Sequence, residues 1–199
     1  MMEARYATYD MSPLSSLVGA AHSTIPAIWA ARAERSNDSQ FLKWRGRRWT
    51  YGEAWKEIRQ VAAALLGVSI YEDRQLRIAS FMPNRPEALW VWFGASAAGA
   101  CYTALNPDYR GPLLEKMLDL IEPDVLFVDA NLVSRLQRLG RSGGGGRIIA
   151  VGAQSDSAVA QVPPPQIERF ESFTLVDPLV QLPPVRPSDT AGIMLTSGT

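Results

Sequence analysis

Short, mainly apolar segments alternate with longer segments of helical periodicity through most of the chain. The apolar segments are largely continuous rather than interrupted at every second residue, which is typical of strands buried on both faces of a parallel sheet. They occupy residues 78–82, 101–105, 125–128 and 147–151. The helical segments between them, at about 86–98, 112–121 and 130–139, have the length of the crossovers that join parallel strands. This order predicts an α/β fold with a largely parallel sheet flanked by helices.

A small hairpin and a capped helix are predicted ahead of this sheet. Residues 41–49 place aromatic side chains on both sides of Arg45-Gly46, a pair suited to a tight turn. Thr50 and Glu53 then have the spacing of a capping box, in which each side chain bonds the other residue's backbone N–H. The apolar residues that follow recur at helical spacing and predict one buried helix face. The expected helix ends at Gly67.

The helix after the first apolar segment is expected to be buried. Asn84 and Glu87 repeat the capping-box spacing loosely at its start. Its side chains include Trp90, Trp92 and Phe93, which make it apolar nearly all round. Aromatic residues of such a helix usually belong to the core, so we expect all three to pack inside.

The composition is that of a globular protein with a sizeable core, since 47% of the residues are hydrophobic, 20% are charged and the formal net charge is zero. The basic run at 45–48 is too short to indicate nucleic-acid binding, so no nucleic-acid partner is expected. The single cysteine, Cys101, cannot form an internal disulfide and is expected to be a buried, inert thiol.

The N-terminal residues predict no targeting or membrane-spanning segment. Charged residues precede the first apolar stretch, unlike in a secretory signal. Residues 14–31 include His22 and Pro26 and are too polar to span a membrane. We therefore expect a soluble, cytoplasmic protein, with a peroxisomal or membrane-peripheral location as the alternatives.

The last residues of the sequence suit a phosphate-binding turn. An apolar segment, 193–195, leads into Thr196, Ser197, Gly198 and Thr199. Hydroxyls and successive backbone N–H groups can donate hydrogen bonds to an anion, and glycine allows its close approach. An ordinary polar turn is the alternative when these four residues are considered alone.

Other polar residues are expected to be structural. His22 has no cysteine or acidic partner at ligand spacing, so no metal site is predicted there. The glycines at 143–146 lack the lysine of a phosphate loop and enter a strand, which favours a flexible loop. Asp108, Asp124 and Asp129 lie near the ends of strands or helices and are interpreted as caps.

Four parts of the sequence occur in the order found in one enzyme superfamily. They are residues 49–53, residues 78–87, residues 105–110 with 123–129, and residues 189–199. Together they resemble the adenylate-forming (AMP-binding) superfamily, which includes acyl-CoA synthetases, luciferases and the adenylation domains of peptide synthetases. The Asn-Arg-Pro-Glu sequence at 84–87 and the aromatic run at 90–94 are most similar to fatty-acyl-CoA and carnitine-CoA type ligases. The resemblance begins near residue 20, so residues 1–19 are interpreted as an N-terminal extension and 20–199 as a partial AMP-binding domain.

The resemblance implies the N-terminal, incomplete part of the ligase large domain and a two-step reaction. ATP, with Mg²⁺, activates a small-molecule carboxylic acid substrate as an acyl-adenylate, and the thiol of coenzyme A then takes the acyl group. Thr196, Ser197, Gly198 and Thr199 match the first four positions of the family's phosphate-binding loop. The loop's lysine, the Mg²⁺-associated glutamate and the catalytic lysine of the C-terminal domain have no counterpart among these 199 residues. We therefore assign no catalytic or metal-binding residue here and expect this polypeptide to be inactive alone.

Two alternatives to an acyl-CoA ligase fragment stay open. The chain could be a non-catalytic remnant that acts at most as a binding or interaction module. It could also be a fragment of a peptide-synthetase adenylation domain, in which a carrier-protein thiol replaces coenzyme A.

Overall fold

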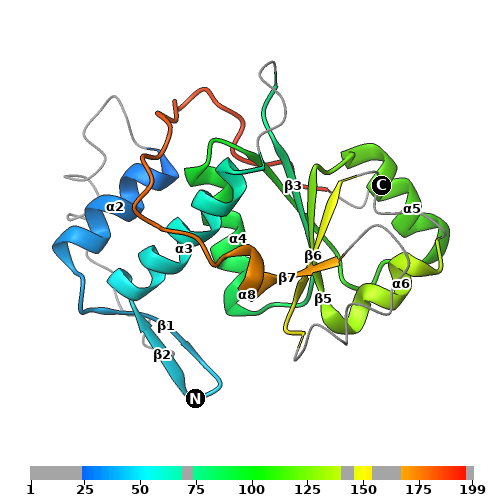
Figure 1. Ribbon diagram of the computed structural model, residues 1–199, viewed down its shortest axis with the longest axis horizontal. Coiled ribbons are helices and arrows are strands. Elements are labelled where there is room, and N and C mark those ends of the chain that lie inside the picture. The colour runs from blue at the N-terminus through cyan, green and yellow to red at the C-terminus, as the bar shows by residue number, and fades with distance from the viewer. Residues whose placement is uncertain (1–23, 69–73, 140–145, 154–166, 196–199) are drawn as a thin grey trace, which may run out of the picture.

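A computed structural model describes residues 24–68, 74–139, 146–153 and 167–195. These residues form a five-stranded, wholly parallel sheet with helices on both faces, and a two-stranded hairpin beside it (Figure 1). The strands lie in the order β4-β3-β5-β6-β7. Their bounds are Arg77–Phe81 (β3), Cys101–Leu105 (β4), Val125–Asp129 (β5), Arg147–Val151 (β6) and Ile167–Arg169 (β7). The predicted α/β fold with a parallel sheet is confirmed.

Both faces of the sheet are covered because successive strand residues point to opposite sides. Phe127 packs on one side and Leu126 on the other, and each is at most 1% exposed. The first side is covered by α3 (Tyr51–Leu66), α4 (Pro86–Ala97) and α8 (Phe170–Phe173), with α2 (Ile25–Arg35) outside them. The second side is covered by α5 (Gly111–Ile121), the short 3₁₀ turn η1 (Ala130–Leu132) and α6 (Val133–Gln137). Burial of each large apolar side chain contributes about 1.5–3 kcal/mol, so these two layers dominate the stability.

The strand order creates a switch point between β3 and β5. β3 lies between β4 and β5 although it precedes both in the chain. The connection after β3 passes through α4 on one face, and the connection after β5 passes through η1 and α6 on the other. The loops that follow β3 and β5 therefore diverge at the carboxyl ends of these neighbouring strands. Open α/β sheets usually bind their ligands in the crevice at such a switch point.

The predicted hairpin and capped helix are confirmed. β1 (Gln40–Trp44) and β2 (Arg47–Thr50) pair antiparallel around a turn at Arg45 and Gly46. The Thr50 N–H donates to Glu53 Oε2 at 2.8 Å, and the Glu53 N–H donates to Thr50 Oγ1 at 3.2 Å. This reciprocal pair satisfies two N–H groups that the first turn of α3 leaves without helical partners.

Elements on either side of the central alternation were missed or misassigned. α2 was not predicted, although Thr24 Oγ1 accepts from the Ala27 N–H at its start and Pro26 stands in its first turn. The sequence near 173–176 suggests a short strand, but the structure has none there. The chain instead forms β7 and then α8, because Phe170 and Phe173 are one helical turn apart and both pack on Phe127.

The start and the outer side of α4 also differ from expectation. The predicted cap by Asn84 is wrong, because the N-cap is Arg85 without a side-chain cap bond. Glu87 binds the Arg85 guanidinium instead of a backbone N–H. Trp90 is 2% exposed, as expected, whereas Trp92 is 40% exposed. Two residues further along a helix is more than half a turn, which places Trp92 on the outer side.

Gly94 lets α3 and α4 pack closely. A Cβ atom at this position would lie 2.7 Å from two side-chain carbons of Val61 and 3.0 Å from the Ile58 carbonyl oxygen. We expect Gly94→Val to lower the free energy of unfolding by about 1–3 kcal/mol or more, because the helices would have to separate. Urea denaturation followed by circular dichroism measures the loss. Gly67→Ala is the matched control, since its Cβ would meet its nearest atom at 3.4 Å, and it should shift the transition little.

The last described segment returns the chain to the edge of the sheet. It passes along α3, where the Arg59 guanidinium donates to the carbonyls of Pro178 at 2.7 Å and Val180 at 2.9 Å (Figure 1). The Tyr102 N–H then donates to the Ala191 carbonyl at 3.2 Å, and the Ile193 N–H donates to the Tyr102 carbonyl at 2.9 Å. Gly192 thus pairs parallel with β4 as an isolated bridge, and the apolar residues 193–195 form no strand. None of the helices in the described ranges is long and apolar enough to cross a bilayer.

Candidate ligand site at the carboxyl edge of the sheet

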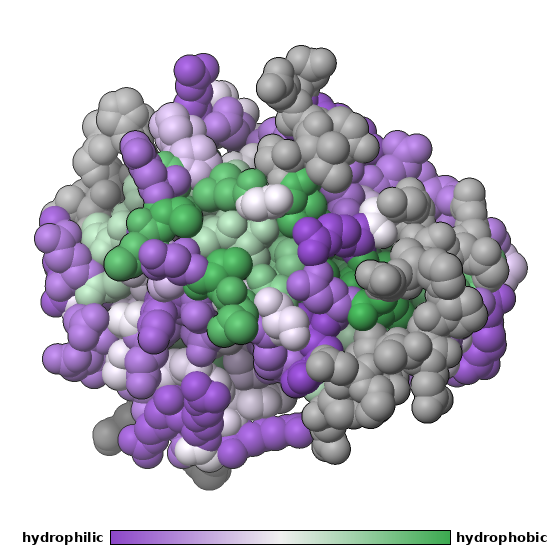
Figure 2. All heavy atoms as spheres, viewed as in Figure 1, coloured by the Kyte–Doolittle hydropathy of each residue, from purple (hydrophilic) through white to green (hydrophobic). Residues whose placement is uncertain are grey.

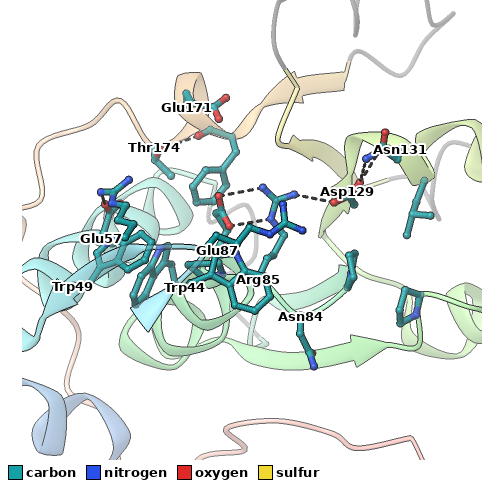
Figure 3. Close-up of a pocket in the computed structure, with 18 of the residues that line it drawn as sticks. Trp44, Trp49, Glu57, Asn84, Arg85, Glu87, Asp129, Asn131, Glu171 and Thr174 are labelled. Carbon is teal, nitrogen blue, oxygen red and sulfur yellow. Dashed lines mark hydrogen bonds and ion pairs between the residues drawn. The ribbon is translucent and has the colours of Figure 1, made fainter. Parts of the chain in front are cut away.

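A pocket of about 850 Å³ opens at the carboxyl ends of β3, β4 and β5. Its walls come from the hairpin, from the loops that follow these three strands, and from α3, α6 and α8 (Figure 3). The volume is within the range of small-molecule sites. Its position includes the switch point between β3 and β5, so this edge of the sheet is the candidate functional site.

Arg85 crosses the switch point. Its Nε and one terminal nitrogen donate to Glu87 Oε2 at 2.9 Å and Oε1 at 3.1 Å, as Figure 3 shows. The other terminal nitrogen donates to Asp129 Oδ2 at 2.8 Å and to the Val151 carbonyl at 3.3 Å. The Arg85 side chain is 21% exposed and that of Asp129 is 9% exposed. One guanidinium therefore joins the carboxyl ends of β3, β5 and β6.

Local backbone geometry makes room for this guanidinium. Gly152, directly after β6, has φ +79°, and a Cβ atom there would lie 2.9 Å from an Arg85 nitrogen. Glycine is therefore required both by the backbone angle and by the close approach. Asp129 Oδ1 also accepts from the backbone N–H and the side-chain amide of Asn131, both at 2.9 Å. The interpretation of Asp129 as a cap is confirmed, while its ion pair with Arg85 was not foreseen.

The Arg85 guanidinium is held in its charged form. Burial alone would lower the pKa of Arg85, but the bonds and charges of Glu87 and Asp129 raise this pKa above its ordinary value. The two carboxylates also accept every hydrogen bond that Arg85 donates at the site except the one to the Val151 carbonyl. Arg85 is therefore a structural cross-link at the switch point, with most of its N–H groups already bonded to protein oxygens.

The remaining walls of the pocket combine a second arginine with aromatic side chains. Arg135 of α6 donates to the carbonyl of Pro107 and, at 3.5 Å, to that of Tyr109, and so holds the loop after β4. Opposite, Trp44 and Arg47 of the hairpin line the pocket together with Glu57 of α3. Burial raises the pKa of Glu57, opposed by Arg47, whose guanidinium lies 4.0 Å away. The pocket thus presents both signs of charge and large apolar rings.

The four predicted phosphate-binding residues, Thr196, Ser197, Gly198 and Thr199, lie outside the described residues. The described segment that leads to them runs parallel to β4 at Gly192. Leu195 packs against the apolar cluster on the α5 side of the sheet. Because strands of a parallel sheet end at the same edge, this direction leads toward the carboxyl edge that holds the pocket.

The other sequence-based assignments have mixed outcomes. Cys101 is buried, as expected, and burial raises the pKa of its thiol despite the opposing charge of Arg77. His22 and the glycine run at 143–145 lie outside the described residues. The interpretation of Asp108 as a helix cap is wrong, because the N-cap of α5 is Arg110. In the described ranges, no cluster of three or more His, Cys, Asp or Glu side chains could hold a metal ion.

Asp124 is not a cap either, and lies at the opposite, amino edge of the sheet. Its carboxylate accepts from two Arg74 nitrogens at 2.7 and 2.6 Å and from the Arg77 N–H at 2.8 Å. Burial alone would raise the pKa of Asp124, but these bonds outweigh burial and hold this pKa below its usual 3.8. The ion pair binds the segment before β3 to the start of β5, which the spacing of the two in the sequence does not indicate.

This depressed pKa predicts a pH dependence of stability. The contribution of Asp124 is complete above the unfolded-state pKa and is lost as the pH falls through the lower folded-state value. We expect Asp124→Asn to lower the free energy of unfolding at pH 7 by about 1.5–3 kcal/mol. The difference from the unsubstituted chain should shrink as the pH falls below about 4. Urea denaturation between pH 2 and pH 7 measures it, and Asp108→Asn, at an exposed position, is the control that should retain the full stability at pH 7.

Comparison with known proteins identifies the family. A model of the AMP-binding enzyme family matches residues 29–199. The chain belongs to the AMP-binding enzyme family. The medium/long-chain fatty-acid–CoA ligase FadD6 of Mycobacterium tuberculosis is 26% identical to this AMP-binding protein over 178 residues, which are 88% of the chain and 27% of the ligase.

Solved structures show the same fold. A mutant form of coronafacic acid ligase from Pectobacterium brasiliense superposes with a TM-score of 0.77 and 12% identity, over 87% of this AMP-binding protein and 33% of the ligase. The anthranilate CoA ligase AuaEII in complex with anthranoyl-AMP superposes with a TM-score of 0.71 and 17% identity, over 85% and 31%. The sequence resemblance is therefore confirmed at the level of family and fold. The chain spans about a third or less of the length of these proteins.

Proposed function

We propose that the chain supplies the N-terminal part of the large domain of an AMP-forming acyl-CoA ligase. The observation that carries the proposal is the pairing of Gly192 with Tyr102 beside β4. This pairing places the described segment before residues 196–199 beside β4, in a sheet whose fold matches adenylate-forming ligases. The family match over residues 29–199 supports the same assignment.

The reaction requires a carboxylate to approach the α-phosphate of ATP, although both are anions. Donors fixed before the reaction lower this barrier because they do not have to reorganise. In the proposed site, Thr196, Ser197, Gly198 and Thr199 donate backbone N–H and hydroxyl groups to phosphate oxygens of ATP. The N–H and hydroxyl groups of these residues suit phosphate oxygens, and the proposed Mg²⁺ would enter the site bound to the phosphates of ATP.

The substrate class proposed is a small-molecule carboxylic acid, and fatty acids are the first to test. The M. tuberculosis relative, which matches over most of the chain, is a medium/long-chain fatty-acid–CoA ligase. A second relative, 4-coumarate–CoA ligase 3 of Arabidopsis thaliana, is 30% identical over 97 residues, 49% of the chain and 17% of that ligase. Both relatives are named CoA ligases, which favours coenzyme A over a carrier-protein thiol as the acceptor. A cytoplasmic location is part of the proposal.

Product analysis tests this function. A protein that contains the chain, the rest of a ligase large domain and its C-terminal domain should convert ATP to AMP and pyrophosphate when given a fatty acid and coenzyme A, and should form the acyl-CoA. Release of ADP and phosphate would exclude an adenylate-forming reaction. Transfer of the acyl group to a carrier protein, with none to coenzyme A, would instead favour the peptide-synthetase alternative.

A further inference from the structure

The tip of the β1–β2 hairpin concentrates positive charge on a projecting element. Lys43, Arg45, Arg47 and Arg48 are all exposed and occur within six residues that include no acidic side chain. The hairpin extends beyond the helices in Figure 1, and hydrophilic residues gather over this part of the molecule in Figure 2. Lys43, Arg45 and Arg48 form no ion pair with any residue of the described chain. Arg47 pairs with Glu57 at 4.0 Å, and its guanidinium lies 4.3 Å from the ring centre of Trp49.

The pairing of the two strands places like charges against each other. Lys43 pairs with Arg48 in the antiparallel register, so both side chains lie on the same face of the hairpin. Like charges directly opposite each other destabilise a β-ribbon. Since the sequence keeps two cations here, the hairpin retains an unfavourable interaction that a bound anionic surface would relieve.

The turn residue adds a second unfavourable choice. Arg45 has φ +46° and Gly46 has φ +86°, the left-handed angles of a two-residue type I′ turn. Asparagine or glycine is favoured at the first of these positions, and an arginine there adopts a sparsely populated backbone region. Residues that are unfavourable for their local backbone conformation are often found at functional positions.

An aromatic ring lies beside these charges. The Arg45 guanidinium lies 5.6 Å from the ring centre of Trp44, which is only partly buried. Tryptophan rings with adjacent arginines are typical of residues at a membrane–water interface, where a ring enters the headgroup layer and the cations meet phosphates.

We propose that the hairpin tip binds the surface of anionic phospholipid membranes. The exposed basic side chains would contact lipid phosphates, while Trp44 contacts the headgroup layer. A narrow hairpin tip meets a planar surface over a small area, and the basic run is too short to follow a nucleic-acid backbone, which favours a bilayer. This interaction does not depend on the proposed ligase activity and requires no ATP.

Vesicle sedimentation with the whole chain tests the proposal. We expect binding to phosphatidylcholine vesicles that contain about a third phosphatidylglycerol, much weaker binding to pure phosphatidylcholine, and release as salt shortens the screening length. Lys43→Gln with Arg48→Gln should lower the partition coefficient about 30-fold, because each basic residue near an anionic surface usually strengthens binding about fivefold. Arg45→Asn should lower it about fivefold while leaving the urea midpoint equal or higher, because Asn-Gly suits the turn. A loss of binding with unreduced stability separates surface binding from a merely structural role.

The matched control removes two exposed cations elsewhere. Lys116→Gln with Arg186→Gln should leave the partition coefficient within about threefold of the original, because these charges lie away from the hairpin. The proposal is overturned if the Lys43 and Arg48 variant binds anionic vesicles as tightly as the original chain, or if the control loses as much. Equal binding to neutral vesicles, or tighter binding to duplex DNA than to anionic vesicles, would also overturn it.

Discussion

Replacing Arg85 with glutamine is expected to lower the free energy of unfolding by about 3–5 kcal/mol. Arg85 balances the charge of Glu87 and of Asp129, whose side chain is only 9% exposed. Glutamine cannot supply the positive charge, so Asp129 would remain as a buried carboxylate at the switch point. The backbone of three strands would also lose its cross-link there. Urea denaturation followed by tryptophan fluorescence and circular dichroism measures the change.

Two further variants separate charge from geometry. Arg85→Lys keeps the charge but cannot make the forked pair with Glu87, and should lose an intermediate amount. Adding Glu87→Gln and Asp129→Asn to Arg85→Gln should restore part of the loss, because no unpaired charge would remain. The structural role of Arg85 is contradicted if Arg85→Gln unfolds at the same urea concentration as the unsubstituted chain.

The sheet was predictable because its strands carry continuous apolar sequences. Helices cover both faces of the sheet, so the side chains of residues 78–82 and 125–128 are buried on both sides and are mostly apolar. α2 and β7 were missed for physical reasons. In α2 only Trp29 and Ala33 are buried, so the apolar periodicity is weak. β7 has just three residues, all partly exposed, and its place comes from pairing with β6 and not from its own composition.

The ion network at the switch point was not predictable from spacing. Asp129 lies 44 residues from Arg85 in the chain, and only the strand order brings the ends of β3 and β5 together. One signal was available, since Arg85 and Glu87 are separated by a single residue at the start of a helix. Glu87 also has the position of the glutamate in a capping box with Asn84, so the sequence suited either a capping box or an ion pair with Arg85. The ion pair forms because the guanidinium donates two parallel hydrogen bonds to the Glu87 carboxylate.

The second large effect concerns Gly198. In a chimera that joins this chain after Thr199 to the remaining part of the M. tuberculosis ligase, Gly198→Val should reduce carboxylate-dependent activity by about 10²–10³-fold. A side chain at this position would prevent the backbone N–H groups from closing on a phosphate oxygen. Steady-state kinetics of acyl-CoA formation measure the loss. Gly67→Ala in the same chimera is the control, and a Gly198→Val chimera with full activity would show that residues 196–199 do not bind ATP phosphates.

Carboxylate-dependent exchange of pyrophosphate into ATP tests the central claim most directly, because it reports formation of the acyl-adenylate without coenzyme A. We predict exchange by the folded chimera in the presence of a medium- or long-chain fatty acid, and none above background by the 199-residue polypeptide alone. Exchange by that polypeptide alone would contradict the assignment of the chain as one part of the catalytic domain. A folded chimera that binds ATP yet catalyses no exchange with any carboxylic acid would contradict its assignment as an adenylate-forming ligase.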